Sequence, residues 1–237
     1  MQINIKKSKA MRITWSRNPG IPNYVYNAKR LDVVTEYKYL GIMLNNKLTW
    51  HTHVDYVLRK ANRMLGFILS VSKSLSQSAI FSVYKSLVIP ILEYGQPAWY
   101  LHTAILSNKI EEIQRRATRI ALRQKRQEMS YEERLIRLNW HSLESRRKFC
   151  LISYVVKALY GLVNCDSVRH GVSVNPRHME AVKFVHLRAR TQRLHCSAIH
   201  TFPRLWEDLP LDLRAEVAVD PLTSWLGKLR HHLHLMT

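Results

Sequence analysis

The hydrophobic pattern divides the chain into a short strand-like part and a longer helical part. In residues 36–44, apolar and polar residues alternate up to Gly41, and β-forming residues lie on both sides of this glycine. This pattern predicts two short strands that meet in a tight turn at Gly41. The simpler interpretation is an ordinary hairpin whose tyrosines pack on the core. A pair of aromatic residues beside a glycine can also lie against a ligand.

Shorter β-forming segments precede this hairpin. They are separated by turn-forming residues and occupy positions 2–5, 10–15, 24–26 and 31–34. We expect them to form a small antiparallel β meander. A sheet of a few short strands is rarely stable by itself. The meander must therefore pack on the helices or on a partner sheet.

From Thr52 onward the apolar residues recur at helical spacing. Pro90 lies inside one helical pattern and predicts a break there. Asn108 with Glu111, and Ser130 with Glu133, have the spacing of helix-capping pairs. The predicted helices are 52–69, 77–94, 108–123, 130–138, 143–162 and 222–235. The expected fold class is therefore α+β, mostly α.

The charge of the chain is strongly positive. Lys and Arg number 37 against 17 Asp and Glu, which gives a formal charge of +20 and a pI near 10.2. Such an excess indicates a polyanion as partner, with nucleic acid the first candidate and an anionic membrane surface the alternative. Solvated Lys and Arg faces without a partner are the plainer explanation.

Four arginines, at 115, 116, 119 and 123, share one face of the helix predicted at 108–123. Glu111 and Glu112 precede the first two by four residues and are expected to pair with them. Arg119 and Arg123 have no acid one turn before them. We therefore expect these two side chains to point outward.

Several kinds of chemistry find no support in the sequence. The three cysteines are widely spaced, and no zinc-finger or HExxH spacing occurs, so we expect neither a disulfide framework nor a metal site. No Asp-x-Asp or Asp-Asp pair is present to hold two metal ions. No apolar run approaches the length of a membrane span, and the N-terminus lacks a signal-peptide core. We expect an intracellular protein, cytoplasmic or nuclear, with no membrane partner.

A series of short motifs occurs in an order that resembles the C-terminal part of the reverse transcriptase of non-LTR (LINE-type, jockey and CR1-like) retrotransposons. Each motif is weak alone, and the order makes the resemblance specific. The motifs are Lys38-Tyr39-Leu40-Gly41, Leu48-Thr49-Trp50 with His53, Lys60-Ala61, Leu65-Gly66, Glu93-Tyr94-Gly95 with Trp99, Ile113-Gln114-Arg115-Arg116, Arg134-Leu135, Leu143-Glu144-Ser145-Arg146-Arg147 and Leu205-Trp206-Glu207-Asp208-Leu209-Pro210.

The resemblance implies specific roles. Tyr39, Leu40 and Gly41 fall near the primer grip, the hairpin that holds the primer end in this family. It implies RNA and RNA/DNA duplex as partners, with the missing palm and fingers as further candidates. The residues expected near nucleic acid are Lys6, Lys7, Lys9, Arg59, Arg63, Arg115, Arg116, Arg119 and Arg123.

The resemblance also implies a division of the chain. We expect a palm remnant at 1–50, a helical thumb-like domain at 51–163, a linker at 164–181 and a basic, helical C-terminal region at 182–237. The family's Tyr/Phe-x-Asp-Asp motif is absent from these residues. We therefore expect no catalytic residue and no cofactor in this chain, because magnesium would belong to the missing catalytic part.

The expected function is that of a reverse-transcriptase fragment that binds RNA or RNA/DNA without strong sequence preference. One alternative is a segment of an intact, active reverse transcriptase that annotation has split. The other is a helical protein-interaction module with no role in nucleic-acid binding. Glu207 stands where the family usually has asparagine, and no zinc-knuckle spacing follows it.

Overall fold

The computed structural model describes most of the chain. The described residues are 4, 7–17, 20, 23–100, 103–124, 128–165, 172–173, 183–184, 198–217 and 220–235. The chain forms two compact units, an N-terminal unit (residues 1–60) and a helical unit (residues 61–237). The boundary falls inside the first long helix.

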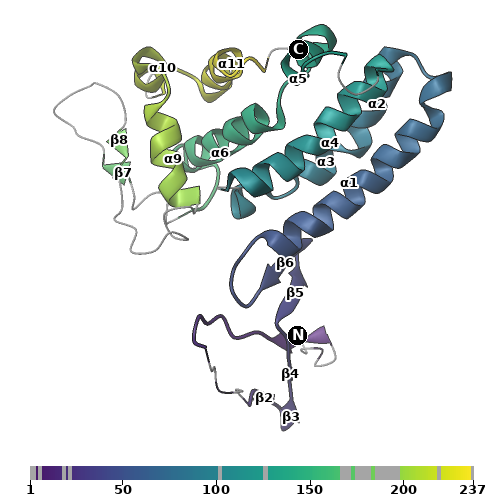
Figure 1. The fold of residues 1–237 in the computed structure, drawn as a ribbon. Coiled ribbons are helices and arrows are strands. Elements are labelled where there is room, and N and C mark those ends of the chain that lie inside the picture. The colour runs from purple at the N-terminus through teal and green to yellow at the C-terminus, as the bar shows by residue number, and fades with distance from the viewer. Residues whose placement is uncertain are drawn as a thin grey trace. The chain divides into compact units, whose positions relative to one another are not determined.

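The N-terminal unit is built from short strands (Figure 1). They are β1 (Lys9–Ala10), β2 (Val25–Tyr26), β3 (Lys29–Arg30), β4 (Asp32–Val33), β5 (Glu36–Tyr39) and β6 (Ile42–Asn45). The pairs β2–β3 and β5–β6 are antiparallel hairpins, as the sequence predicts. The pair β1–β4 is parallel, which departs from a simple meander. A connection of some twenty residues between β1 and β4 is long enough for such a crossover.

Both hairpins turn through two residues with positive φ. The β2–β3 turn uses Asn27 and Ala28, at φ 48° and 59°, and the β5–β6 turn uses Leu40 and Gly41, at 45° and 86°. Two-residue turns of this kind match the twist of paired strands. The predicted turn at Gly41 is confirmed. Leu40 carries a Cβ in the left-handed region, which costs about 1–2 kcal/mol.

The helical unit begins inside α1, whose first residues belong to the N-terminal unit (Figure 1). The α-helices are α1 (His51–Val71), α2 (Gln77–Leu87), α3 (Ile89–Glu93), α4 (Ala104–Leu122), α5 (Tyr131–Leu138), α6 (Leu143–Leu159), α9 (Ala198–Glu207), α10 (Leu211–Glu216) and α11 (Leu222–His232). Short 3₁₀ turns lie at η2 (Ser72–Ser74) and η3 (Gln96–Trp99), and β7 (Val172–Ser173) pairs with β8 (Lys183–Phe184). The expected fold class, α+β and mostly α, is confirmed.

Local sequence signals predict some helix ends correctly and others incorrectly. The predicted break at Pro90 is present, because α2 ends at Leu87 and α3 begins at Ile89. Both hydrogen bonds of the Ser130–Glu133 capping box form. The predicted cap at Asn108 is wrong, since α4 begins four residues earlier, after Thr103. Thr103 Oγ1 accepts the amide of Leu106, which leaves Asn108 on the exposed surface of the helix.

Aromatic side chains pack among aliphatic ones in the core of the helical unit. Tyr84 of α2 stacks on Trp140 with ring centroids 4.9 Å apart. In the C-terminal region Trp206 of α9 stacks on Trp225 of α11 at 5.9 Å, and both are buried against apolar residues of α6. The C-terminal helices thus share a core with α6. Most of the predicted linker at 164–181 lies outside the described residues, and the four-part division stays a prediction.

Candidate nucleic-acid interface

The predicted primer-grip residues form the tip of the β5–β6 hairpin. Tyr39 is 58% exposed and Leu40 is 73% exposed. Gly41 provides the second positive φ of the turn. The tip therefore presents one aromatic and one aliphatic side chain on a backbone held in a strained conformation.

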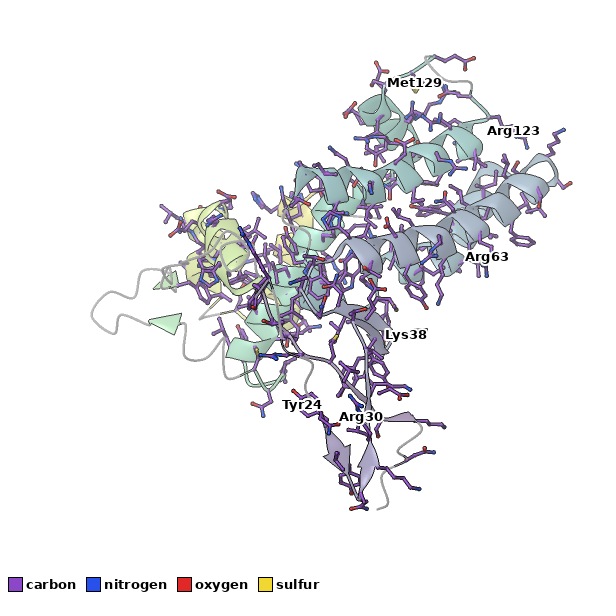
Figure 2. All side chains as sticks on the ribbon, turned by 60° about the horizontal axis from the view of Figure 1, so that its bottom comes forward. Tyr24, Arg30, Lys38, Arg63, Arg123 and Met129 are labelled. Atoms are coloured by element: carbon purple, nitrogen blue, oxygen red, sulfur yellow. The ribbon has the colours of Figure 1, made fainter. Side chains whose placement is uncertain are left out.

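The strands of the same hairpin contact the N-terminal half of α1. Lys38 Nζ lies 5.1 Å from the centre of the Tyr56 ring, and Lys60 Nζ lies 4.9 Å from it. Hydrogen bonds from Lys38 and Lys60 lower the pKa of the Tyr56 hydroxyl. His53 Nδ1 accepts the amide of Met43 at 3.2 Å, and burial lowers the pKa of His53 to about 4. Sequence reasoning did not single out Lys38, Tyr56 or Lys60 as site residues, although Lys38 and Lys60 both lie in family motifs. Figure 2 labels Lys38.

The other basic residues predicted in the N-terminal unit are dispersed. Lys6 lies outside the described residues. Lys7 is exposed in a short 3₁₀ turn, and Arg59 is exposed on α1, where its Nε donates to the carbonyl of Asp55. Lys9 forms an ion pair with Asp32 across the β1–β4 pair, which lowers the pKa of that carboxyl. Lys9 therefore has a structural partner on the strand beside it.

In the helical unit, three of the predicted arginines lie in one groove. The arginine groove has a volume of about 510 Å³ and runs between the end of α1, η2 and α4. Its walls contain four cationic side chains and no acidic one. The lining residues are Leu69, Ser72, Lys73, Arg116, Arg119, Ile120, Arg123 and Gln124. Sequence reasoning missed Lys73, because only the tertiary fold brings η2 beside α4.

Each of the three arginines is held through its guanidinium group. Arg116 Nη1 donates to Asn62 Oδ1 of α1. Arg119 has no acid one turn before it, but its Nη2 lies 3.1 Å from Oε1 of Glu112, two turns earlier on α4. Residues seven apart share a helix face, and two long side chains can span that rise. Arg123 is exposed, and its Nη2 donates to the carbonyl of Leu75 at 3.1 Å.

Arg63 and Arg115 lie outside the arginine groove. Arg115 faces α5, with its guanidinium 5.2 Å from the centre of the Tyr131 ring. Its Nη1 is 3.7 Å from Glu112. Arg63 is exposed on α1, and Figure 2 labels it together with Arg123 at the end of α4. The structure thus brings Arg116, Arg119 and Arg123 together and separates Arg115 from them.

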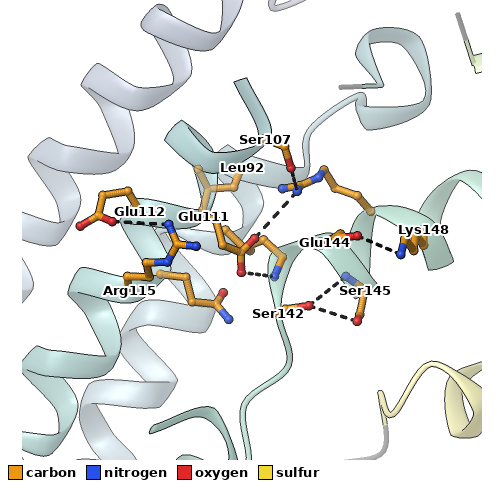
Figure 3. A network of polar contacts seen from close by, with 12 residues as sticks. Leu92, Ser107, Glu111, Glu112, Arg115, Ser142, Glu144, Ser145 and Lys148 are labelled. Carbon is orange, nitrogen blue, oxygen red and sulfur yellow. Dashed lines mark hydrogen bonds and ion pairs between the residues drawn. The ribbon is translucent and has the colours of Figure 1, made fainter. Parts of the chain in front are cut away.

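A buried carboxylate fixes the rotation of α4. Glu111 is 6% exposed and accepts hydrogen bonds from the Leu143 amide at 3.0 Å and from the Tyr131 hydroxyl. Figure 3 labels Glu111 in this network, together with Ser107 of the same helix. Arg147, 3% exposed, lies 3.8 Å from Glu111 and donates to Ser107 Oγ at 2.6 Å. The expected pairing of Glu111 with Arg115 is therefore wrong.

The reason is that α5 and α6 cover this face of α4. Burial, followed by the charge of Glu111, raises the pKa of Tyr131, so its hydroxyl stays a hydrogen-bond donor. With Glu111 turned inward to α6, the stripe that carries Arg116, Arg119 and Arg123 faces the groove instead. The buried network thereby determines which basic side chains of α4 face the arginine groove.

The described residues hold no cluster suited to a catalytic metal. Among them, no group of three or more His, Cys, Asp or Glu side chains lies close enough to hold an ion. The magnesium ions that the family resemblance assigns to a catalytic part therefore do not fit these residues. None of the described helices is both long and apolar enough to span a membrane.

A groove lined by basic side chains, as in the helical unit, is typical of proteins that hold nucleic acid through its backbone. Comparison with known proteins points to one such class. The chain is 26% identical over 121 residues to the RNA-directed DNA polymerase of the mobile element jockey from Drosophila melanogaster, a match that covers 49% of this chain and 13% of that polymerase. It is 27% identical over 121 residues to the probable polymerase of the Drosophila transposon X-element, again 13% of that protein.

A third relative, the probable RNA-directed DNA polymerase of Drosophila transposon BS, is 34% identical over 92 residues, which is 38% of this chain and 10% of that protein. The resemblance to non-LTR retrotransposon polymerases is thus confirmed. The chain spans only a small part of the relatives it matches. No protein-family model and no solved structure matches it.

Proposed function

We propose that this chain contributes a backbone-binding surface of a reverse-transcriptase type, which holds RNA/DNA duplex without strong sequence preference. The observation that carries the proposal is the arginine groove, where Lys73, Arg116, Arg119 and Arg123 converge without an acidic residue in the lining. Lys and Arg at phosphates supply affinity that does not depend on sequence. The names of the relatives support an RNA-containing template as the substrate class.

The three arginines suit this task because their guanidinium groups are already held in place. Bonds to Asn62, Glu112 and the Leu75 carbonyl hold them in the groove before any ligand arrives. A prearranged guanidinium loses less conformational entropy on binding, and its planar donors match phosphate oxygens. Each arginine has further N–H groups left to donate.

The hairpin tip supplies a second contact in the proposal. Tyr39 and Leu40 project from a turn whose left-handed Leu40 is costly for the fold itself. Strain of this kind tends to persist where function requires it. We assign the tip to the end of a primer strand, in line with its motif. Polymerase activity would require a cluster of carboxylates, and the residues that the structure describes do not bring one together.

The sharpest test of the groove uses Lys73. Among the described residues it makes no hydrogen bond or ion pair, so Lys73→Gln should leave the fold intact. Binding of the full chain to a labelled RNA/DNA duplex should weaken roughly threefold or more. Lys109→Gln is the matched control, because Lys109 is exposed on α4 outside the groove. Equal affinities for both variants and the parent would contradict the proposal.

A further inference from the structure

A second groove of the helical unit lies where α6 meets α2, α3 and α11. The α6 groove has a volume of about 570 Å³, within the range of ligand sites. Its walls contain four cations and a single acid, Glu93. Arg146 neutralises that acid through a bidentate ion pair. A net excess of three cations therefore remains, from Lys85, Lys157 and Arg230.

None of these three cations has an acidic partner among the residues that the structure describes. Lys85 Nζ lies 5.8 Å from the centre of the Phe81 ring, and Arg230 lies 5.2 Å from the centre of the Phe149 ring. A guanidinium stacked on an aromatic face is oriented, yet its N–H groups stay available at the edge. Arg230 is thus arranged to donate two parallel hydrogen bonds to an anion.

An unsatisfied hydroxyl lies in the same groove. Ser153 is 6% exposed, and its Oγ has no hydrogen-bond partner among the described residues. Burying a hydroxyl without a hydrogen-bond partner costs free energy. A hydrogen bond to a ligand oxygen or amine in the groove would offset that cost. The aromatic residues Phe149 and Tyr154 line the wall beside it.

We propose that the α6 groove binds a single-stranded nucleic-acid segment. Lys85, Lys157 and Arg230 hold backbone phosphates, Tyr154 or Phe149 contacts a base, and Ser153 donates to a phosphate or ribose oxygen. The combination of cations with aromatic faces is the recurring design of single-strand sites. A duplex keeps its base faces stacked inside and cannot reach an aromatic wall of this kind. This site is separate from the arginine groove and does not depend on it.

The test is a comparison of two variants of one helix. Lys157→Gln and Lys148→Gln each remove one positive charge from α6, but Lys148 is paired with Glu144 at 2.9 Å and does not line the groove. Full-chain protein is titrated with a labelled single-stranded RNA of about ten nucleotides and with an RNA/DNA duplex. We expect Lys157→Gln and Arg230→Gln to weaken single-strand binding about fivefold or more. Lys148→Gln should bind like the parent.

Ser153→Ala separates a binding role from a structural one. Because the hydroxyl is unsatisfied in the free protein, its removal should leave the unfolding free energy unchanged or raise it. Single-strand affinity should fall at the same time. A clear loss of stability with unchanged RNA affinity would assign Ser153 to the fold and count against the proposal.

The outcomes for the two grooves differ. If Lys157→Gln and Arg230→Gln bind single-stranded RNA like the parent, the α6 site is overturned, whatever Lys73→Gln does to duplex binding. If polyglutamate of equal charge displaces the RNA as well as unlabelled RNA does, the groove accepts any acidic chain and the proposal is also overturned. Single-strand binding that depends on Lys157, with no duplex binding at all, would support this site and reject the function proposed for the arginine groove.

Discussion

Arg146 of α6 forms a bidentate ion pair with Glu93 of α3, with Nη2 3.0 Å from Oε2. Each residue belongs to one of the motifs that carry the family resemblance. Other motif residues are also internal: Trp99 Nε1 donates to the Tyr94 carbonyl, and Trp206 is 1% exposed. These motif residues therefore hold the helical unit together, whereas others, such as Tyr39, Leu40 and Arg116, lie at the surface.

Removing this ion pair should destabilise the helical unit. Glu93 and Arg146 side chains are 27% and 30% exposed, so the pair is partly shielded from water. We expect Glu93→Gln to lower the unfolding free energy by about 1–2 kcal/mol, because a bidentate charged pair is stronger than a surface one. Urea denaturation of both single variants and the double variant measures the coupling energy. A coupling near zero would show that the pair does not link α3 to α6.

Glu111 should matter far more than its neighbour Glu112. Glu111→Gln leaves the buried Arg147 without its charge partner, which we expect to cost about 3–5 kcal/mol. Glu112 has an exposed carboxylate that contacts Arg115 and Arg119, so Glu112→Gln should cost less than about 1 kcal/mol. Chemical denaturation of the two variants compares them directly. Equal losses would contradict the buried network.

The attachment of the hairpin to α1 should weaken in acid. His53 accepts the Met43 amide only when its ring is neutral, and its pKa is lowered from 6.5 to about 4. The stabilisation is therefore complete above pH 6.5 and is lost as the pH falls toward 4, by roughly 3 kcal/mol in total.

Hydrogen exchange of the β5–β6 amides between pH 7 and 4, corrected for intrinsic rates, measures this loss. His53→Asn keeps an acceptor in a similar place and should flatten the dependence. His51→Asn, at an exposed position, should not change it. An unaltered pH profile in His53→Asn would show that another group titrates.

Leu40 should be a position where stability and binding move in opposite directions. Leu40→Asn replaces a residue that is strained at φ 45° with one that tolerates this region, which we expect to stabilise the hairpin by about 1 kcal/mol. It also removes the exposed apolar side chain at the tip. Affinity for a duplex with a recessed primer end should fall, while affinity for a blunt duplex should not. Loss of affinity for both would argue against a primer contact.

The sequence predicted the elements better than their contacts. The turn at Gly41, the break before Pro90 and the Ser130 capping box depend on residues close together in the chain, and all three are confirmed. The predicted N-cap of α4 at Asn108 is wrong because Thr103 and Asn108 both suit the start of a helix. Only the folded structure distinguishes between them.

The site was harder to predict for a related reason. The arginine stripe was visible from its spacing, but the partners of its members were not. Glu111 points inward because α6 brings Arg147 to it, and Lys73 enters the groove because η2 turns back toward α4. Both facts depend on residues more than thirty positions apart, which no local pattern reports.

The central claim is that the arginine groove binds the backbone of an RNA/DNA duplex, and the salt dependence of binding tests it most directly. With four cations at phosphates, the logarithm of the binding constant should fall with log salt at a slope of about −3.6. This corresponds to roughly a 100-fold loss between about 50 and 200 mM. Arg119→Glu with Arg123→Glu should abolish most of the slope, while Arg115→Glu should retain it. A flat dependence in the parent, or an unchanged slope in the folded double variant, would contradict the account.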